Sequence, residues 1–521
     1  MNSPTALDIP RTAFSPGDDL PSILSRHAAA SPDRVAVIEG DRQLSFREFD
    51  RAIAAVAASL VRRGVTRGSR VAVLAENSIE YAVLFFATLR AGASIVPLPT
   101  MASRESLKLM LDDCAATTFA TSNLHRATAT ALLDARHAVR IGLDFDGDGF
   151  TRWDDLILGA PDSSEPVAVA GTDEFDVIYS SGTTGIPKGI VHSHGARKAS
   201  YLGSRAQYFS ADSVNVVATP FYSNTTCITW FLTTAAGGAN VILRKFSADA
   251  FLDAAEGHRA THAMLVPVQY DRLFASPNFA AARLATMRHL FSTSAPLRAE
   301  LKRRVVDELP ALLVEIYGLT EGGPTTALET KHHPDKLSSV GKPALGADIR
   351  IIDEAGRDVP VGQAGEVVGR ATTMMNEYLN RPDATREILW RDDQGTLYYK
   401  SGDLGRFDED GFLYLLDRKK DVIISGGFNV YATDIEAVLA RHPAVREVAV
   451  IGVASERWGE TPLALVALKD GAVATPEELF TYVNGLVGKA ERVSRVEILD
   501  DLPKSAIGKV LKRELKQRFS A

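Results

Sequence analysis

The chain has 521 residues, of which 45% are hydrophobic and 24% are charged. This length exceeds the roughly 100–200 residues of one ordinary domain, so we expect two or more domains. The formal net charge of −7 argues against nucleic acid or an anionic membrane as the main partner. The two cysteines are too few for a disulfide framework or a metal site. No apolar run reaches the ~20 residues of a membrane-spanning helix, and the first residues lack the pattern of a secretory signal, so we expect a cytoplasmic protein.

Short apolar runs rich in Val and Ile alternate with longer amphipathic stretches through most of the sequence. The runs predicted to be strands are, in chain order, 70–75, 93–98, 118–122, 175–180, 215–219, 240–243, 263–266 and 290–293. Helices are predicted between them, for example at 46–61, 78–90 and 105–113. Continuous apolar strands that alternate with helices are typical of parallel sheets covered on both faces. The sequence therefore predicts an α/β fold with a large N-terminal domain of stacked, mostly parallel sheets.

The pattern changes in the last third of the chain. Short strands at 349–353, 365–370, 395–400 and 411–416 are separated by turn residues, which predicts a small β-barrel-like subdomain. After a polar run at 417–421, the predicted order is strand, helix 434–441, strands 447–453 and 464–469, and helix 476–487. We therefore predict an N-terminal domain at 1–416, a hinge at 417–421 and a small, mobile α+β C-terminal domain at 422–521.

The segment 179–189, which reads Tyr-Ser-Ser-Gly-Thr-Thr-Gly-Ile-Pro-Lys-Gly, follows a predicted strand. It contains three glycines, four Ser or Thr hydroxyls and one lysine. Glycines let backbone N–H groups approach an anion, hydroxyls donate to phosphate oxygens, and Lys188 supplies positive charge. Glycine content alone would favour a flexible surface turn. The hydroxyl run and the lysine favour a polyphosphate-binding loop, although the spacing differs from the Walker motif.

This loop resembles the signature loop of the adenylate-forming superfamily, which includes acyl-CoA synthetases, peptide-synthetase adenylation domains and firefly luciferase. Five further motifs resemble those of the same superfamily, in the same order, at 317–321, 401–403, 417–418, 425–430 and 503–509. Within the superfamily, the chain is most similar to fatty-acid or aryl-acid CoA ligases. The resemblance implies a two-step enzyme that binds ATP, Mg²⁺ and coenzyme A.

The resemblance also implies which residues contact the nucleotide and coenzyme A. They are Ser180, Ser181, Gly182, Thr183, Thr184, Gly185, Lys188, Ser294, Ala295, Pro296, Tyr317, Gly318, Thr320, Asp403, Arg418, Lys420, Gly426, Gly427, Phe428 and Lys509. Tyr317 would stack on the adenine, although a tyrosine at a strand end is more often a core residue. Asp403, expected in a turn, would accept both ribose hydroxyls, because an ionised carboxylate offers two acceptor oxygens. Ser294 stands where the superfamily usually has glycine.

The catalytic residues that the resemblance implies are Lys509, Glu321 and Thr184. Glu321 would hold Mg²⁺ together with a hydroxyl from Thr183 or Thr184, because Mg²⁺ takes few protein ligands and bridges substrate phosphates. Lys509 would bridge the attacking carboxylate and the α-phosphate, and a positioned donor of this kind is worth ~3–4 kcal/mol. Without the motif around it, Lys509 would be interpreted as part of a solvated helix face. Lys420 falls where the superfamily has its hinge residue.

The acid would lie against Tyr222, Asn224, Thr225, Gly318 and Gly322. Tyr222 replaces a histidine that the superfamily often has, so the usual gate of the acyl tunnel is altered. The surrounding segments 221–226, 291–296 and 318–325 contain no Lys, Arg or His. A pocket without a cation favours a fatty or aromatic acid over a dicarboxylate. The remaining histidines, including the pairs His192/His194 and His332/His333, lack metal partners and are expected to be structural or exposed. Trp458 is expected to pack within the small domain.

The implied reaction activates a carboxylic acid as an acyl-adenylate and then transfers the acyl group to a thiol. Coenzyme A is the favoured thiol, because the chain stops shortly after Lys509 and leaves no room for a carrier domain. The alternatives are an adenylating enzyme that loads a separate carrier protein, a luciferase-like oxidase, and an inactive nucleotide sensor. Retention of both Glu321 and Lys509 argues against the sensor. The identity of the acid stays open, as does a homodimeric assembly.

Overall fold

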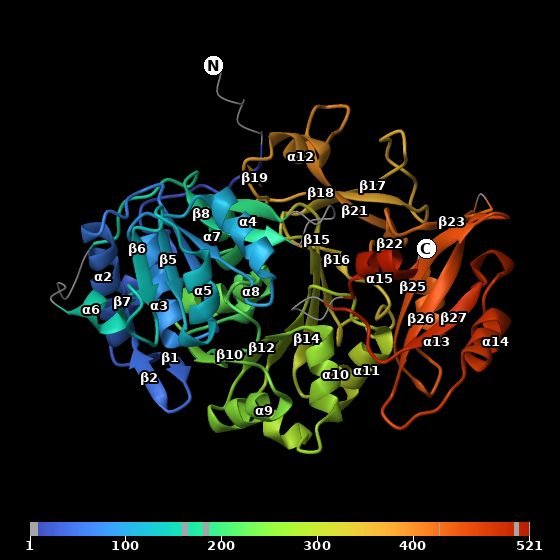
Figure 1. The fold of residues 1–521 in the computed structure, drawn as a ribbon, viewed down its shortest axis with the longest axis horizontal. Coiled ribbons are helices and arrows are strands. Elements are labelled where there is room, and N and C mark those ends of the chain that lie inside the picture. Colours follow the sequence, from blue (N-terminus) through green and yellow to red (C-terminus); the bar gives the residue numbers. More distant parts are fainter. Residues whose placement is uncertain (1–8, 159–164, 181–186, 427, 505–509, 520–521) are drawn as a thin grey trace. The chain divides into compact units, whose positions relative to one another are not determined.

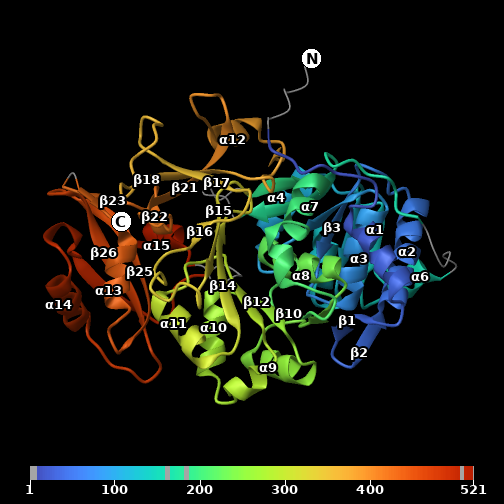
Figure 2. The ribbon, with the colours of Figure 1, turned by 180° about the vertical axis from the view of Figure 1, so that it is seen from behind.

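The computed structural model describes residues 9–158, 165–180, 187–426, 428–504 and 510–519 of the chain. These residues fall into two compact units (Figures 1 and 2). The first unit comprises Met1–Asp348 and Gly369–Tyr399, and the second comprises Ile349–Val368 and Lys400–Ala521. Among the described residues, no helix is both long and apolar enough to cross a membrane.

The first unit contains a nine-stranded sheet with the strand order β16-β15-β14-β13-β12-β10-β11-β1-β2. Its strands are β1 (Val35–Glu39), β2 (Arg42–Ser45), β10 (Val214–Val217), β11 (Ala239–Ile242), β12 (His262–Leu265), β13 (His289–Ser292), β14 (Leu312–Gly318), β15 (Thr325–Glu329) and β16 (Lys342–Pro343). All neighbours from β1 to β14 run parallel. The strands at the two edges pair antiparallel.

A second, eight-stranded sheet in this unit has the order β19-β9-β8-β4-β3-β5-β6-β7. Its strands are β3 (Arg70–Leu74), β4 (Ser94–Pro97), β5 (Thr118–Thr121), β6 (Val139–Gly142), β7 (Thr151–Arg152), β8 (Glu174–Ser180), β9 (Lys188–Ser193) and β19 (Glu377–Tyr378). Only β9 runs antiparallel to its two neighbours. Each strand predicted before residue 340 coincides with an observed one, so the prediction of mostly parallel α/β sheets is confirmed.

The helices of the first unit cover these sheets. They are α1 (Leu20–Ala30), α2 (Phe46–Arg62), α3 (Ile79–Arg90), α4 (Arg104–Cys114), α5 (Arg126–Leu132), α6 (Trp153–Ile157), α7 (His194–Tyr201), α8 (Asn224–Ala236), α9 (Ala248–Gly257), α10 (Pro267–Ala275), α11 (Ala299–Glu308) and α12 (Pro382–Glu387). Helices α1 and α2 lie beside α3 (Figure 2). Helix α2 begins with a reciprocal capping box between Ser45 and Glu48.

Helix α3 lies at the centre of the main core. All 12 of its residues are buried, including Glu80 and Arg90, which form ion pairs with Arg42 and Asp50. Its core cluster contains residues of both sheets, including Val71 of β3 and Val217 of β10. Phe85 packs edge-on against Trp230 of α8, with 4.9 Å between the ring centroids. The two sheets of this unit therefore share one core, which α3 and α8 help to fill.

The second unit combines a β-rich region with a small α+β region. The five-stranded sheet contains β17 (Asp348–Ile352), β18 (Gly365–Arg370), β20 (Leu389–Arg391), β21 (Leu397–Phe407) and β22 (Leu413–Arg418), of which β20 and parts of β18 and β21 belong to the first unit. The C-terminal sheet contains β23 (Ile423–Ser425), β24 (Phe428–Val430), β25 (Val445–Ser455), β26 (Gly459–Leu468) and β27 (Arg495–Leu499). Its helices are α13 (Ala432–Leu439), α14 (Pro476–Leu486) and α15 (Lys512–Phe519).

The motif 401–403 lies inside strand β21, so the expectation of a turn at Asp403 was wrong. Gly402 has a φ of +71°, and the pairing of β21 with β22 shifts between Leu404 and Gly405. The backbone N–H of Asp403 donates to the Ser401 hydroxyl at 3.0 Å, and that hydroxyl donates to the carbonyl of Val367 at 2.7 Å. A glycine with positive φ beside a register shift is typical of a β-bulge, which bends a strand without ending it.

Alanine at position 402 should weaken this bulge. The new Cβ would meet no atom within 4 Å, but a positive φ costs an L-residue roughly 1–2 kcal/mol. The N–H of Lys419, which donates to the Gly402 carbonyl at 2.9 Å, should exchange its hydrogen about tenfold faster in Gly402→Ala. Gly411→Ala is the matched control, since Gly411 also has a positive φ and open space around its Cα. Equal exchange of the Lys419 amide in wild type and Gly402→Ala would contradict the prediction.

Candidate active site

Several predicted site residues of the first unit lie where strands end. Ser180 ends β8, Tyr317 and Gly318 end β14, and Ser294 follows β13. Strands β13 and β14 are parallel neighbours, so the segments that follow them leave the same edge of the sheet, where α/β folds bind ligands. Other predicted residues lie outside the described part of the chain, namely Ser181, Gly182, Thr183, Thr184, Gly185, Gly427 and Lys509.

Glu321 and Lys188 both contact Tyr378. The Tyr378 hydroxyl donates to Oε1 of Glu321 at 2.6 Å. The Lys188 ammonium lies over the ring of Tyr378, 4.8 Å from its centroid, in a cation–π contact. Within the described part of the chain, neither Lys188 nor Glu321 forms an ion pair. A carboxylate at the hydroxyl and an ammonium over the ring thus contact one tyrosine, both without a counter-ion from the described residues.

The backbone around Glu321 is held by close packing. The N–H of Met375 donates to the Glu321 carbonyl at 2.8 Å. Gly322 has a φ of +76°, and a Cβ at this position would lie 2.6 Å from the Thr373 carbonyl oxygen. Both the backbone conformation and the close approach require glycine here. Gly322, which was expected to face the acid, therefore has a packing role of its own.

A buried group of three charged or titratable side chains joins two of the predicted segments. Asp176 of β8 is fully buried, and its Oδ2 lies 2.6 Å from the Arg197 guanidinium. Nδ1 of His192 lies 2.8 Å from Asp176 Oδ1. Nε2 of His192 lies 2.7 Å from the carbonyl oxygen of Thr320, so this nitrogen carries a proton and donates. Arg197 also donates to Oδ1 of Asn224 at 2.7 Å.

Burial and neighbouring charges shift the pKa values of the titratable side chains in this region. Burial raises the pKa of Asp176, but Arg197 and His192 outweigh burial and bring the pKa below its ordinary value. Burial and the neighbouring Arg197 lower the pKa of His192, more than Asp176 raises it. Burial lowers the pKa of His194 to about 4. Asp176 is therefore an anion at neutral pH, and Arg197 is its counter-ion.

The residues predicted to face the acid are mostly buried. Tyr222 is 9% exposed, and burial raises the pKa of its hydroxyl. Thr225 and Ser294 are joined by a hydrogen bond between their hydroxyls. Ser294 has a φ of +78°, a left-handed conformation that favours glycine, the residue expected at this position from the resemblance. Arg197 contacts Asn224 from outside the segments 221–226, 291–296 and 318–325, so the sequence did not reveal this cation beside a predicted acid residue.

A second buried ion pair supports the segment that contains Ser294. Lys302 of α11 pairs with Glu315 of β14, and both side chains are almost completely buried. Oε1 of Glu315 accepts from the N–H of Leu297 at 3.2 Å, and Lys302 also donates to the Ser339 carbonyl at 2.8 Å. Burial raises the pKa of Glu315, which Lys302 partly opposes. The pair ties the segment after β13 to strand β14.

In the second unit, Asp403 and Arg418 are partners. Arg418 Nε lies 2.7 Å from Asp403 Oδ1 across the β21–β22 pair.

Burial lowers the pKa of Lys420, the predicted hinge residue. Gly426 donates its N–H to the Trp458 carbonyl at 2.8 Å. Trp458 is 46% exposed and Phe428 is 66% exposed, so the expectation that Trp458 packs inside the small domain was wrong.

The sequence matches two families, described as "AMP-binding enzyme" over residues 24–379 and "AMP-binding enzyme C-terminal domain" over residues 434–509. A feruloyl-CoA synthase from Amycolatopsis sp is 34% identical over 498 residues, 95% of this chain and 98% of that protein. An indoleacetate–CoA ligase from Aromatoleum aromaticum is 31% identical over 504 residues, 96% of this chain and 98% of that protein. The crystal structure of ATP-bound MatB from Rhodopseudomonas palustris is similar with a TM-score of 0.86 at 30% identity, covering 96% of this chain and 99% of that one.

Replacing Asp176 by asparagine should destabilise the first unit strongly. The change leaves Arg197 buried without its counter-ion, and breaking a buried pair in this way costs about 3–5 kcal/mol. Asp154→Asn is the matched control, because Asp154 pairs with Arg152 at 3.4 Å on the surface, where such a change costs about 0.5 kcal/mol or less. Denaturant unfolding monitored by tryptophan fluorescence measures both variants. Equal midpoints for the two variants would contradict the importance of this buried charge.

Proposed function

This chain belongs to the AMP-binding enzyme family and is an AMP-forming carboxylic acid–CoA ligase, and we propose that its acid substrate has an aromatic tail. In the first step, the acid carboxylate attacks the α-phosphorus of ATP, which forms an acyl-adenylate and releases pyrophosphate. In the second step, the thiol of coenzyme A attacks the acyl carbon and AMP leaves. Relatives that match nearly the whole chain are named as CoA ligases, so loading of a separate carrier protein is not favoured.

One observation carries the proposal of an aromatic acid. The relatives named above act, by their names, on feruloyl and indoleacetate groups. The charges near the predicted acid residues fit an uncharged tail, because Arg197, which contacts Asn224, already has Asp176 as its counter-ion. The segments 221–226, 291–296 and 318–325 supply no Lys, Arg or His with which a second carboxylate on the substrate could pair. Burying such an unpaired carboxylate is costly.

We assign the magnesium site to Glu321 with a hydroxyl of Thr183 or Thr184. Carboxylate and hydroxyl oxygens are ligands that Mg²⁺ prefers, and the ion usually keeps only one or two protein carboxylates beside phosphates and water. This fits the described residues, among which no three His, Cys, Asp or Glu gather into a metal site. When bound, Mg²⁺ would neutralise charge on the ATP phosphates.

The remaining nucleotide contacts follow from the same assignment. Lys188 supplies positive charge to the phosphates, and it has no ion-pair partner among the described residues. Tyr317 and Ser294 flank the adenine from the adjacent ends of β14 and β13. Asp403, held by Arg418 at 2.7 Å, accepts the ribose hydroxyls. Ordered side chains of this kind orient the α-phosphorus toward the acid before the reaction begins.

The C-terminal residues 422–521 act as a lid that presents two different faces to the same site. Lys509 serves the first step, since its ammonium stabilises the negative charge that builds between carboxylate and α-phosphate. A rotation about the hinge 417–421, with Lys420 as its pivot, withdraws Lys509 and presents residues 426–428 for thioester formation. The match of residues 434–509 to the C-terminal domain family supports this division of the chain.

A panel of acids tests the substrate class. Purified protein with MgATP and coenzyme A should convert an aryl-propenoic or aryl-acetic acid at least about a hundredfold more efficiently than a short dicarboxylic acid, judged by kcat/KM for AMP release. It should also prefer the aryl acids over a fatty acid of equal carbon number. Mass spectrometry of the acyl-CoA confirms the product. A preference for the dicarboxylic or the fatty acid would contradict the proposal.

Lys509→Ala separates the two steps. Adenylate formation, measured as ATP–pyrophosphate exchange, should fall by roughly 10²–10³-fold, because a charge-stabilising donor is lost. Conversion of supplied acyl-adenylate to thioester should change little. Arg518→Ala removes a cation from the same end of the chain and should leave both steps intact. Equal losses in both steps of Lys509→Ala would show that Lys509 does not have the proposed role.

A further inference from the structure

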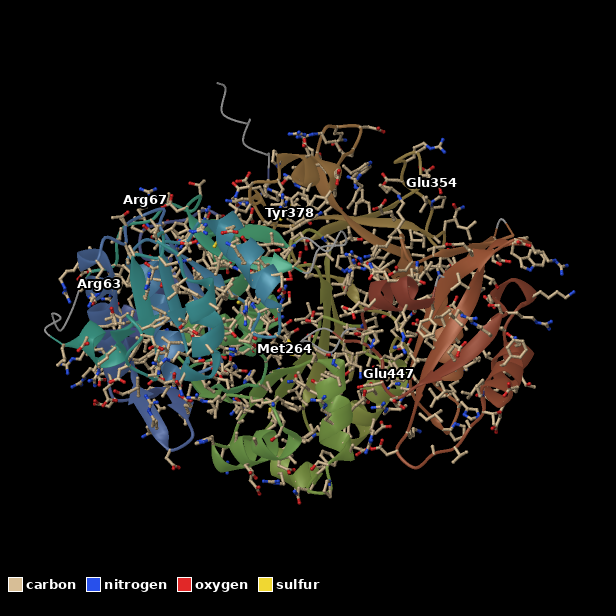
Figure 3. All side chains as sticks on the ribbon, viewed as in Figure 1. Arg63, Arg67, Met264, Glu354, Tyr378 and Glu447 are labelled. Carbon is tan, nitrogen blue, oxygen red and sulfur yellow. The ribbon has the colours of Figure 1, made fainter. Side chains whose placement is uncertain are left out.

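Tyr378 touches both side chains to which the proposed function gives charge-handling roles at the phosphates. Its hydroxyl donates to Oε1 of Glu321 at 2.6 Å, and its ring lies under the ammonium of Lys188 at 4.8 Å from the centroid. Figure 3 labels Tyr378 among the side chains of the first unit. Neither the loop motif nor the motif around Glu321 contains this residue, which follows Glu321 by 57 positions.

The backbone holds Tyr378 firmly in this place. Strand β19 pairs antiparallel with β9, and Tyr378 lies opposite Ile190. The N–H of Leu379 donates to the Gly189 carbonyl, directly after Lys188, at 2.7 Å. The N–H of Tyr378 donates to the Thr385 hydroxyl at 3.0 Å, and its side chain is 5% exposed. Because β19 is paired with β9, the strand that begins with Lys188, the Tyr378 ring has little freedom to move away from Glu321.

The hydroxyl contact restricts the Glu321 carboxylate. A hydrogen bond to an ionised carboxylate is shorter and stronger than a neutral one, which agrees with the distance of 2.6 Å. An ionised carboxylate has about four acceptor positions, of which the phenol uses one. The carbonyl of the same residue is held by Met375 N–H at 2.8 Å. Glu321 is therefore fixed at both ends, while Oε2 keeps its acceptor positions for a cation.

The ring contact gives the Lys188 ammonium a partner other than a carboxylate. A direct Lys–Glu pair would neutralise the carboxylate that a cation needs and the ammonium that a phosphate needs. The aromatic face offers the ammonium a weaker attraction, worth roughly 1 kcal/mol where exposed, which a phosphate can displace. The described residues contain no Lys188–Glu321 ion pair, although both side chains contact Tyr378.

We propose that Tyr378 is a positioning residue of the nucleotide site, which orients Glu321 for a divalent cation and keeps Lys188 available for phosphate. This inference rests on the proposed function, in which Glu321 binds the metal and Lys188 the phosphates. Tyr378 does not touch the reacting atoms in this account. It acts through the two side chains that it holds.

Tyr378→Phe and Tyr399→Phe form a matched pair of variants. Both remove one buried phenol hydroxyl from the same unit, and the Tyr399 hydroxyl donates to the Met375 carbonyl at 3.0 Å rather than to Glu321. Mn²⁺ binding to the full-length protein in the presence of ATP, without acid, is measured by electron paramagnetic resonance. Tyr378→Phe should weaken Mn²⁺ binding about tenfold, the usual worth of a hydrogen bond to a charged group. Tyr399→Phe should leave it within about twofold of wild type.

Tyr378→Leu tests the second half of the inference. This variant loses the ring as well as the hydroxyl, so Lys188 and Glu321 become free to pair directly. Binding of ATP in EDTA, measured by calorimetry, depends on Lys188 and not on a metal. It should weaken several-fold in Tyr378→Leu and stay unchanged in Tyr378→Phe, which keeps the cation–π contact.

The outcomes separate this inference from the function on which it rests. If the wild type binds no Mn²⁺ in an ATP-dependent way, the metal assignment fails and the role of Tyr378 fails with it. If the wild type binds Mn²⁺ and Tyr378→Phe binds it equally well, only the inference is overturned. Equal weakening in Tyr378→Phe and Tyr399→Phe would also overturn it, because the effect would then be general to buried hydroxyls. If Tyr378→Leu binds ATP in EDTA as tightly as the wild type does, Tyr378 does not keep Lys188 available for phosphate.

Discussion

The first unit depends on one buried negative charge, the carboxylate of Asp176. A carboxylate that is completely buried is tolerable only if a partner satisfies it, and here the Arg197 guanidinium does so, 2.6 Å from Oδ2. The two residues beside this carboxylate reach different segments of the site, because His192 donates to the Thr320 carbonyl and Arg197 donates to Asn224. Satisfying a single charge therefore fixes a nucleotide segment and an acid segment at the same time.

A second buried carboxylate of this unit, that of Glu315, is also neutralised by a cation of the protein. Glu315 is buried and paired with Lys302, and it holds the segment after β13 through Leu297. Lys188 and Glu321, in contrast, form no ion pair among the described residues. The buried charges of Asp176 and Glu315 are thus neutralised within the protein, while the proposed function keeps Lys188 and Glu321 for ligands. A ligase that joins an acid to ATP needs this division, because phosphates and cations must find charges that are not already paired.

The sequence was sufficient for the features that depend on local pattern. Alternating apolar runs predicted the parallel strands, and the glycine- and hydroxyl-rich loop before Lys188 led to the family. Contacts between residues far apart in the sequence could not be predicted from pattern. Arg197 reaches Asn224 across 27 residues, and Tyr378 reaches Glu321 across 57. The turn expected at Gly402 was wrong for a different reason, since a glycine with positive φ serves a bulge within a strand as well as a turn.

The central claim is that the acid itself captures the α-phosphorus of ATP before coenzyme A reacts. An acid labelled with ¹⁸O in both carboxylate oxygens tests this most directly. The account predicts that AMP released with the thioester carries one labelled oxygen on its phosphate, as seen by mass spectrometry, because the carboxylate oxygen stays with phosphorus when the thiol displaces AMP. Label found in pyrophosphate or inorganic phosphate, or AMP without label, would contradict the account.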